Sequence, residues 1–274
     1  MRMISPLRYP GGKSILYDKV VKFINTNGLR QKTYTEPYSG GFGIGVKLLL
    51  CGAVENVIIN DFDQCVYAFW KSLFFNTDRL VKLINETEIN IENWRKQKNI
   101  YNNYKNFTEL EVGFATLFLN RTNYSGVLKG GPIGGLEQKG KYKIDCRFNK
   151  ERIIKIIRAL AEKKDKVEIF NLDAIALIEK LKKQESEIFY YFDPPYVAKG
   201  KELYTNYYKD QDHENLATRI HATTAKWIMT YDNCDLIKKL YERYNPQEFS
   251  LRYSAGQAKT GSELFISNVK TEEF

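Results

Sequence analysis

Apolar positions recur along this chain with two different spacings, and the spacings predict strands that alternate with helices. Apolar residues at a helical period cover residues 14–24, and a short strand is predicted at 33–38. A helix from Val46 and a strand at 56–60 come next. Such alternation is typical of an α/β fold built on a parallel sheet.

The same alternation returns in the carboxyl-terminal part of the chain. Strands are predicted there at 167–171, 188–192, 226–231, 247–253 and 263–268, and helices at 174–184, 212–225 and 235–244. The run at 188–192, Ile-Phe-Tyr-Tyr-Phe, is typical of a strand buried on both faces. Pro194 and Pro195 end this strand because proline cannot donate a ladder hydrogen bond.

Between these two parts, residues 68–164 show helical periods and turns without a strong strand. Thr108 and Glu111 have the spacing of a capping box before an apolar helix, and Asn149 is predicted to cap a further helix. The block is therefore predicted to be an inserted, mainly helical domain. The main domain would then consist of residues 1–67 and 165–274.

The first candidate site follows the buried strand at 188–192, where the chain continues as Asp193, Pro194, Pro195 and Tyr196. Open α/β sheets bind ligands at the carboxyl ends of their strands. The prolines stiffen the backbone that holds a carboxylate, a carbonyl and an aromatic ring together. A rigid turn that Asp193 caps is the structural alternative.

A second candidate site follows the first predicted strand. Ser39, Gly40 and Gly41 begin a glycine-rich turn between a strand and a helix, as in a nucleotide-binding βαβ unit. Asp61 ends the next strand, where an acid can accept hydrogen bonds from ribose hydroxyls. Alternatively, Asp61 caps the helix predicted at 64–75.

Lys13 lies at the amino end of the first predicted helix, after a Pro-Gly-Gly turn. A cation is unfavourable at this end of a helix unless an anion binds nearby, and a cofactor carboxylate would be such an anion. The alternative is a lysine that is simply solvated.

A glycine-rich segment inside the helical block carries basic, amide and aromatic side chains. These groups suit contacts to phosphates and to base edges, so the segment is predicted to bind nucleic acid. A solvated surface loop is the alternative. The residues predicted to contact DNA here are Arg121, Asn123, Tyr124, Ser125 and Lys129.

Charge and cysteine content narrow the class of protein. The 274 residues include 42 lysines and arginines against 33 acids, and the net charge of +9 favours a nucleic-acid partner. Four widely spaced cysteines and two histidines predict no metal site. With no recognisable signal peptide and no apolar run of transmembrane length, a cytoplasmic location without a membrane partner is expected.

Taken in order, these motifs resemble those of the Dam-type, alpha-group (D12 class) DNA adenine-N6 methyltransferases. The resemblance covers most of the chain. It is carried by six segments, at residues 8–13 (Arg-Tyr-Pro-Gly-Gly-Lys), 36–41 (Glu-Pro-Tyr-Ser-Gly-Gly), 60–61 (Asn-Asp), 118–122 (Phe-Leu-Asn-Arg-Thr), 193–196 (Asp-Pro-Pro-Tyr) and 263–268 (Glu-Leu-Phe-Ile-Ser-Asn).

The resemblance implies a Rossmann-like sheet that binds S-adenosyl-L-methionine, with an inserted target-recognition domain. The enzyme would methylate the exocyclic N6 of an adenine flipped out of duplex DNA, held by Asp193, Pro194 and Tyr196, with Tyr204 as a second wall of the base pocket. The implied cofactor-binding residues are Tyr9, Lys13, Ser39, Gly40, Gly41, Asp61, Asp173 and Asp193.

Several alternatives stay open at this stage. A nicotinamide-dependent dehydrogenase also fits the glycine turn and Asp61, but it gives the Asp-Pro-Pro-Tyr segment no role. A methyltransferase for RNA or a protein amide, and a non-catalytic DNA-binding module, are further possibilities. A monomer or weak dimer is expected, with a cognate restriction endonuclease as one candidate partner. The stretch after Gly126 differs from that of enzymes that read GATC, so the recognition sequence is open.

Overall fold

The computed structural model describes residues 5–8, 13–197, 208–253 and 259–269. Within these residues, seven strands form one sheet in the order β3-β2-β1-β4-β5-β7-β6. Neighbouring strands from β3 to β5 run parallel, whereas β7 is antiparallel to both β5 and β6. The strands are β1 (Thr33–Glu36), β2 (Val57–Asn60), β3 (Val167–Phe170), β4 (Ile188–Phe192), β5 (Lys226–Asp232), β6 (Gln247–Tyr253) and β7 (Lys259–Ser267).

Helices connect most of the strands. The α-helices are α1 (Tyr17–Thr26), α2 (Gly43–Leu50), α3 (Gln64–Phe75), α4 (Thr77–Glu86), α5 (Ile91–Asn102), α6 (Glu109–Thr122), α7 (Lys150–Ala161), α8 (Ala174–Leu181), α10 (Asp210–Ala222) and α11 (Asp235–Leu240). The 3-10 helices are η1 (Ser14–Leu16), η2 (Tyr104–Asn106), η3 (Tyr124–Gly126), η4 (Lys164–Lys166), η5 (Lys182–Glu187) and η6 (Glu242–Tyr244). The predicted mixed α/β fold with a mostly parallel sheet is confirmed.

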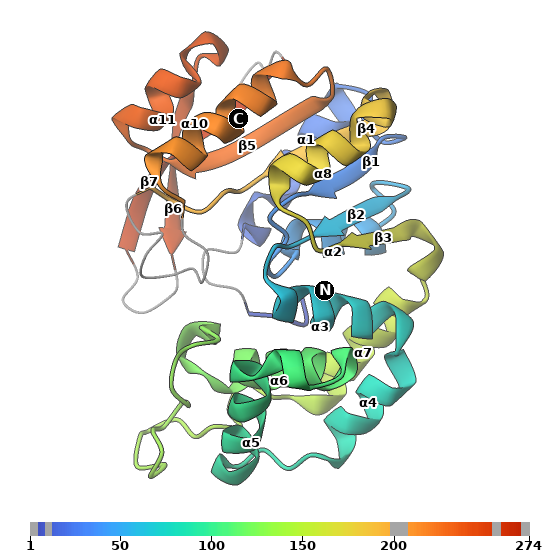
Figure 1. The fold of residues 1–274 in the computed structure, drawn as a ribbon, viewed down its shortest axis with the longest axis vertical. Coiled ribbons are helices and arrows are strands. Elements are labelled where there is room, and N and C mark those ends of the chain that lie inside the picture. The colour runs from blue at the N-terminus through green and yellow to red at the C-terminus, as the bar shows by residue number, and fades with distance from the viewer. Residues whose placement is uncertain (1–4, 9–12, 198–207, 254–258, 270–274) are drawn as a thin grey trace.

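The sheet is covered by helices on both faces (Figure 1). Strand β4 shows how: Phe189 and Tyr191 pack into the core cluster that contains α1 and α2, whereas Tyr190 and Phe192 pack into the cluster with α8, α10 and α11. Successive side chains of a strand point to opposite faces, so an apolar run is what a doubly covered strand requires. The prediction of a fully buried strand at 188–192 is confirmed.

The strand order reverses between β1 and β4. From β1 the chain builds outward through β2 and β3, and it then returns to the other side of β1 to place β4 and β5. In such sheets the crevice outside the carboxyl ends of the two central strands is the usual ligand site. The loop after Glu36 and the turn at Asp193 therefore lie at the same crevice.

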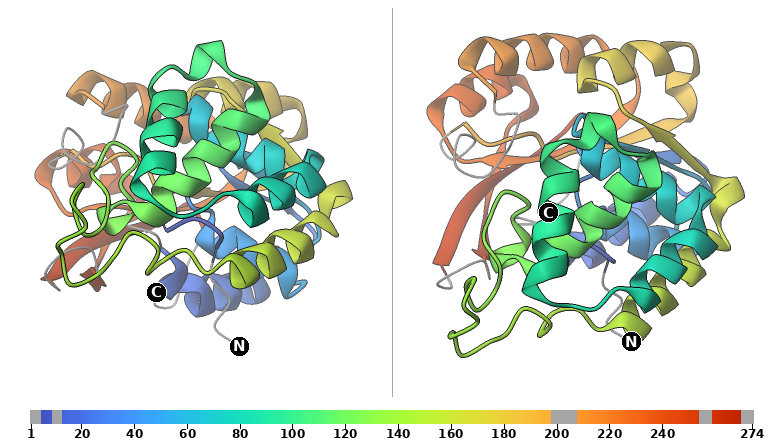
Figure 2. Two further views of the ribbon diagram at one scale, coloured as in Figure 1. Left: turned by 90° about the horizontal axis from the view of Figure 1, so that it is seen from below. Right: turned by 60° about the horizontal axis from the view of Figure 1, so that its bottom comes forward.

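Helices α3 to α7 lie together at one end of the molecule (Figures 1 and 2). The capping box of Thr108 and Glu111 and the cap at Asn149 are confirmed. The predicted domain boundary after residue 67 falls within α3, whose buried Trp70 belongs to the same core cluster as Tyr34 of β1. The helical block thus shares a core with one face of the sheet, and its status as a separate domain stays a prediction.

The last strand of the sheet is longer than the sequence predicts. Strand β7 starts at Lys259, four residues before the predicted strand at 263–268, because it pairs along the whole of β6.

In the part of the chain that the structure describes, no helix has the length and apolar character needed to cross a membrane.

Candidate active site

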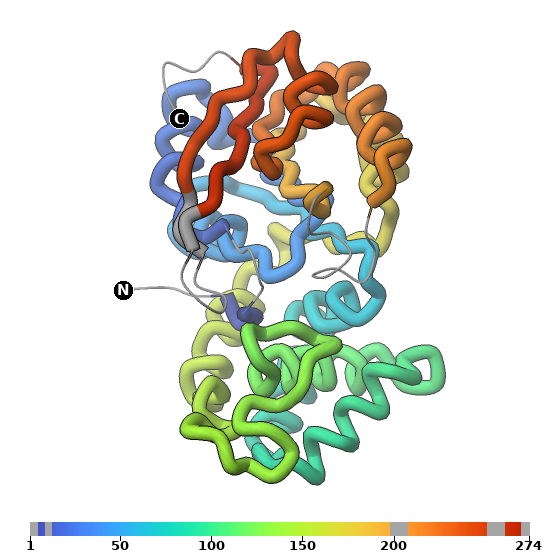
Figure 3. The backbone as a smooth tube through the Cα atoms, turned by 90° about the vertical axis from the view of Figure 1, so that its left-hand side faces the viewer, coloured from blue at the N-terminus to red at the C-terminus, as the bar shows by residue number. Residues whose placement is uncertain are grey.

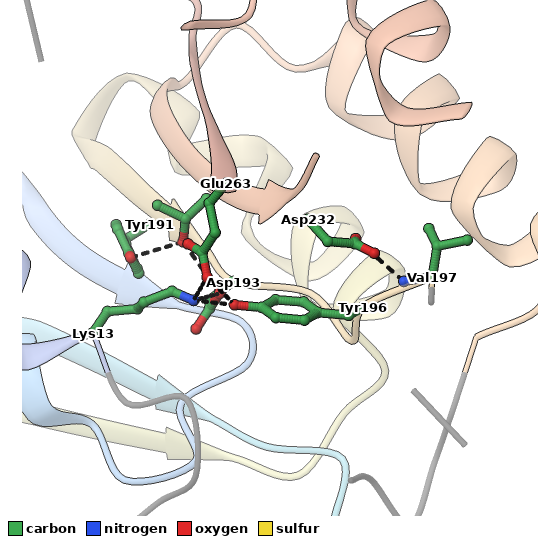
Figure 4. A network of polar contacts seen from close by, with 8 residues as sticks. Lys13, Tyr191, Asp193, Tyr196, Val197, Asp232 and Glu263 are labelled. Carbon is green, nitrogen blue, oxygen red and sulfur yellow. Dashed lines mark hydrogen bonds and ion pairs between the residues drawn. The ribbon is translucent and has the colours of Figure 1, made fainter. Parts of the chain in front are cut away.

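Three charged side chains meet at the crevice, and they come from distant parts of the chain. Lys13 Nζ lies 3.1 Å from Asp193 Oδ1 and 3.0 Å from Glu263 Oε1, in β7 (Figure 4). The side chains of Lys13 and Glu263 are 4 % and 0 % exposed, whereas that of Asp193 is 23 % exposed. The pair of Lys13 and Glu263 is therefore buried, and Asp193 is the member of the three that reaches the surface.

Neutral hydroxyl groups complete this cluster. Tyr196 donates its hydroxyl hydrogen to Glu263 and accepts a hydrogen bond from Lys13, whose Nζ is also 4.9 Å from the centre of the Tyr196 ring. The Thr230 hydroxyl donates to Asp193 Oδ1 at 3.1 Å. Asp193 is thus fixed through one carboxylate oxygen, by a cation on one side and a hydroxyl on the other.

Burial and charge set the protonation of the cluster. Burial and the nearby Glu263 carboxylate raise the pKa of Asp193 to about 6, although Lys13 and Thr230 act to lower it. Burial alone would lower the pKa of Lys13, but Asp193 and Glu263 together raise it above its ordinary value. At neutral pH Lys13 is therefore a buried cation, and Asp193 is ionised but close to its titration range.

This geometry decides between the two interpretations of Lys13. The lysine is buried, so the solvated alternative is wrong. The anions that it needs near the start of η1 are the protein's own carboxylates, Asp193 and Glu263. A contact between Lys13 and the cofactor stays a prediction.

Asp61 lies at the carboxyl end of β2, in the same crevice. Its two oxygens accept hydrogen bonds from the backbone amides of Gly40 at 2.8 Å and Asp63 at 2.9 Å. Gly40 takes a left-handed φ of +46°, which glycine adopts without strain. Burial and the Asp63 charge raise the pKa of Asp61 to about 7, although the hydrogen bonds from the two backbone amides act to lower it. The cap of α3 is Asp63, so the interpretation of Asp61 as that cap is wrong.

Ser39 and Asp173 have local structural roles at this edge. The Ser39 hydroxyl donates to the Glu36 carbonyl at 2.9 Å and accepts from the Asn60 amide at 3.0 Å, which ties β1 to β2. Ser39 is buried and its hydroxyl is used inside the protein, and the predicted contact of this residue with the cofactor stays a prediction. Asp173 caps α8 by accepting from the Ile175 amide at 2.9 Å. Gly41 lies in the turn before α2.

Two acids at the site were not singled out from the sequence. Glu263 is one, and Glu36 at the end of β1 is the other. Glu36 accepts hydrogen bonds from the Tyr34 hydroxyl at 2.7 Å and the Gly45 amide at 3.2 Å. Burial raises its pKa to about 8, with Asp193 adding to the rise. The available signal was an acid near the end of a predicted strand, since a buried carboxylate there needs a partner.

The segment after α6 is held from within by Asn123. This side chain is fully buried, accepts from the Trp94 indole at 2.7 Å, and donates to the carbonyls of Val127 at 2.9 Å and Leu128 at 3.1 Å. The amide of Asn123 therefore shapes the loop, and its predicted contact with DNA stays a prediction.

Arg121 also makes contacts within the protein. Its guanidinium donates to the carbonyls of Pro6 at 2.5 Å and Ser5 at 3.0 Å, so those hydrogen-bond donors position the amino-terminal segment. Tyr124 is 57 % exposed, and Lys129 is exposed as well. Ser125 is partly exposed and holds a left-handed φ of +53°, a strained conformation of the kind found at functional sites.

Tyr9 and Tyr204 lie outside the described residues, so their predicted contacts with the cofactor and the base remain predictions. The other predicted site residues divide into two groups. Lys13, Asp193 and Tyr196 lie in one cluster at the crevice and Asp61 follows β2. Tyr124, Ser125 and Lys129 instead follow α6 in the helical block.

Most of the residues that form this crevice lie within the match of this chain to a known protein family. The family model of the D12 class N6 adenine-specific DNA methyltransferases matches residues 9–255, which include Lys13, Asp61 and Asp193. The chain belongs to this family. It is also similar to the Type II methyltransferase M.MjaIII of Methanocaldococcus jannaschii, with 26 % identity over 262 residues that cover 87 % of this chain and 88 % of that protein.

As a D12 methyltransferase, the protein is an enzyme that uses S-adenosylmethionine to methylate the N6 position of adenine in DNA. The resemblance drawn from the sequence motifs is confirmed by this membership. The dehydrogenase, the RNA or protein-amide methyltransferase and the non-catalytic module are set aside.

Proposed function

We propose that this D12 methyltransferase receives a flipped adenine at Asp193 and Pro194, with Tyr196 forming part of the wall of the base pocket. One observation carries the proposal: Asp193 is held through a single oxygen at the reversal point of the sheet, yet its side chain is 23 % exposed. A carboxylate that is fixed and still accessible is suited to accept a hydrogen bond from a substrate.

The chemistry follows from the target atom. The lone pair of the adenine amine is delocalised into the ring, so the amine is a weak nucleophile. The Asp193 carboxylate and the Pro194 carbonyl each accept one of its two N–H groups, which favours a pyramidal nitrogen and stabilises the positive charge that develops there. Lys13 keeps Asp193 ionised and oriented, and correct alignment contributes much of the acceleration.

The crevice fits the cofactor that the family uses. S-adenosylmethionine supplies an electrophilic methyl group. Asp61 would accept hydrogen bonds from its ribose hydroxyls, since this carboxylate is partly exposed and held at the end of β2 by two backbone amides. Asp173, at the end of the loop after β3, would contact the adenine ring of the cofactor. Gly40 and Gly41 allow the backbone to approach the cofactor closely.

Duplex DNA must release its target base before the reaction, at a cost of roughly a few kcal/mol. We assign the recognition of the duplex to the helical block, through the exposed side chains of Tyr124 and Lys129 and through Ser125. Detection of N6-methyladenine in a duplex treated with enzyme and cofactor tests the activity itself. Sequencing with detection of modified bases, in cells that carry this gene, gives the recognition sequence.

Lys129→Ala is expected to weaken DNA binding and to lower the slope of log Kd against log salt by about 1, because one phosphate contact is lost. The matched control is Lys183→Ala. Lys183 is exposed in η5, which leads into the amino end of β4, away from the crevice. Fluorescence anisotropy over a salt series gives both slopes. Equal slopes for the two variants would place Lys129 off the DNA.

Activity is expected to fall as the pH drops through about 6, where Asp193 becomes protonated and can no longer accept through an ionised carboxylate. Glu263 raises the pKa of Asp193, so Glu263→Gln removes this effect and lowers that pKa. The acid limb of kcat/KM should therefore move to lower pH in this variant. A limb that stays in place or moves upward would contradict the assigned coupling.

Further proposals concern the partners. We infer a monomer or weak dimer that acts on duplex DNA in the cytoplasm; the four free cysteines suit a reducing compartment. A cognate restriction endonuclease is proposed because the relative in Methanocaldococcus jannaschii is a Type II methyltransferase.

A further inference from the structure

A second concave site lies away from the crevice, where the amino-terminal segment meets the end of α6 and the start of α7. It is a pocket of about 270 Å³, and four arginines contribute to its wall: Arg8, Arg121, Arg147 and Arg152. Cys146 and Asn149 line it as well. Among the described residues that line the pocket, none carries a carboxylate.

Burial and neighbouring arginines disfavour the charged guanidinium groups of Arg8 and Arg121 in this pocket. Arg8 Nη1 is buried and has no hydrogen-bond partner. Burial and the neighbouring Arg8 and Arg152 lower the pKa of Arg121 to about 10. Burial, followed by Arg147, lowers the pKa of Arg8. Gathering guanidinium groups in a partly desolvated pocket is unfavourable, and an anion among them would reverse the sign of the interaction.

The pocket is built before any ligand arrives. Arg121 is fixed by the carbonyls of Ser5 and Pro6. The backbone of Arg8 is fixed by Asn120, which accepts from its amide at 2.6 Å and donates to its carbonyl at 3.0 Å. Arg147 and Arg152 are exposed at the rim. Arg121 with its guanidinium held, Arg8 with its backbone held and two exposed arginines thus line one anion site, with the positive end of α7 beside it.

The pocket is coupled to the segment that we assign to DNA recognition. Asn120 donates a further hydrogen bond to the Gly126 carbonyl at 3.0 Å. Gly126 takes φ +77°, and a Cβ at this position would lie 2.0 Å from the Arg8 carbonyl oxygen, so only glycine fits. Figure 3 shows residues 5–8, in dark blue, beside the start of the loop that follows α6.

We propose that this four-arginine pocket binds a phosphate group, and that the group belongs to the backbone of the duplex held for methylation. Arginine forks match phosphate oxygens well. The pocket is slightly below the roughly 300–1,000 Å³ of ordinary small-molecule sites, which suits a single phosphate projecting from a larger molecule. The DNA source rests on the proposed function, and free phosphate is the other source of the same chemistry.

The first test measures DNA affinity across a salt series with Arg147→Gln, using Lys183→Gln as the matched control. Arg147 is exposed, so its replacement should leave the fold intact. A DNA phosphate in the pocket predicts weaker binding and a slope of log Kd against log salt that falls by about 1 in Arg147→Gln only. Arg8→Gln provides a second variant in the lining of the pocket.

The second test uses Cys146 as a reporter, because this exposed thiol lines the pocket. Its alkylation by iodoacetamide is followed by mass spectrometry, with exposed Cys51 at the end of α2 as the internal control. Inorganic phosphate should slow the reaction of Cys146 several-fold and leave Cys51 unchanged, and Arg147→Gln should remove this protection. Duplex DNA should also protect Cys146 in the wild-type enzyme.

The two tests together distinguish a DNA phosphate in the pocket, a free anion in the pocket, and no anion binding at all. A reduced salt slope in Arg147→Gln supports a DNA phosphate. An unchanged slope with protection by inorganic phosphate supports the pocket but assigns it to a free anion. An unchanged slope without protection overturns the proposal. If the wild-type enzyme methylates DNA in the same preparation, that last outcome leaves the proposed function intact.

Discussion

Asp193→Ala is expected to abolish methyl transfer while leaving the enzyme folded. Loss of one preorganised group that stabilises developing charge costs on the order of 10²–10³-fold in rate, and here the same carboxylate also orients the amine. The fold should survive because Lys13 keeps Glu263 as a partner 3.0 Å away. Initial rates with labelled cofactor and a thermal unfolding curve check both halves of the prediction.

The matched control is Asp165→Asn, since Asp165 is an exposed acid in η4, outside the crevice. This control should methylate at the wild-type rate. Asp193→Asn should remain nearly inactive, because an amide keeps the shape of the side chain but not its charge. Substantial turnover by a folded Asp193→Ala enzyme would refute the role assigned to this carboxylate.

Lys13→Met is expected to have the largest combined effect on stability and rate. It leaves Asp193 and Glu263 near each other without their cation, and removing one partner of a buried ion pair costs about 3–5 kcal/mol. Because Lys13 lowers the pKa of Asp193, its loss raises that pKa and leaves more of the carboxyl protonated at neutral pH. Denaturant unfolding and a pH–rate profile measure the two consequences.

A double substitution tests whether the effects of Lys13→Met come from the two carboxylates left without their cation. Glu263→Gln added to Lys13→Met removes the second negative charge, so it should recover part of the lost stability and return the acid limb toward lower pH. The interaction free energy from this cycle should fall within the 0.5–3 kcal/mol usual for residues in contact. Additive effects of the two substitutions would show that Lys13 and Glu263 act independently.

The sequence predicted those parts of the site that depend on local pattern. Asp193 and Asp61 each follow a short apolar strand, and parallel strands bring their carboxyl ends to one edge, so both were placed correctly at the crevice. The caps at Thr108 and Asn149 were predicted for the same reason, since a cap is recognised within four residues.

Local pattern does not reveal the parts of the site that depend on long-range contacts. Glu263 lies 250 residues from Lys13, and no spacing rule indicates that the two side chains pair. We expected Asn123 to contact DNA because its type suits base edges, and the sequence does not show that its amide accepts from Trp94 on another helix. Its contact with DNA stays a prediction. The predicted domain boundary falls inside α3, whose Trp70 shares a core cluster with β1, and a change in pattern does not show which helices share a core. The division into two domains stays a prediction.

The most direct measurement is the structure of the enzyme in complex with a substrate duplex and S-adenosylhomocysteine. We expect the target adenine to lie outside the helix, with its N6 about 2.6–3.2 Å from an Asp193 carboxylate oxygen and within reach of the Pro194 carbonyl. The role of Asp193 would be contradicted if the adenine were extruded but its amine faced other groups. Asp193 would then contact only Lys13 and Thr230 and lie far from the amine.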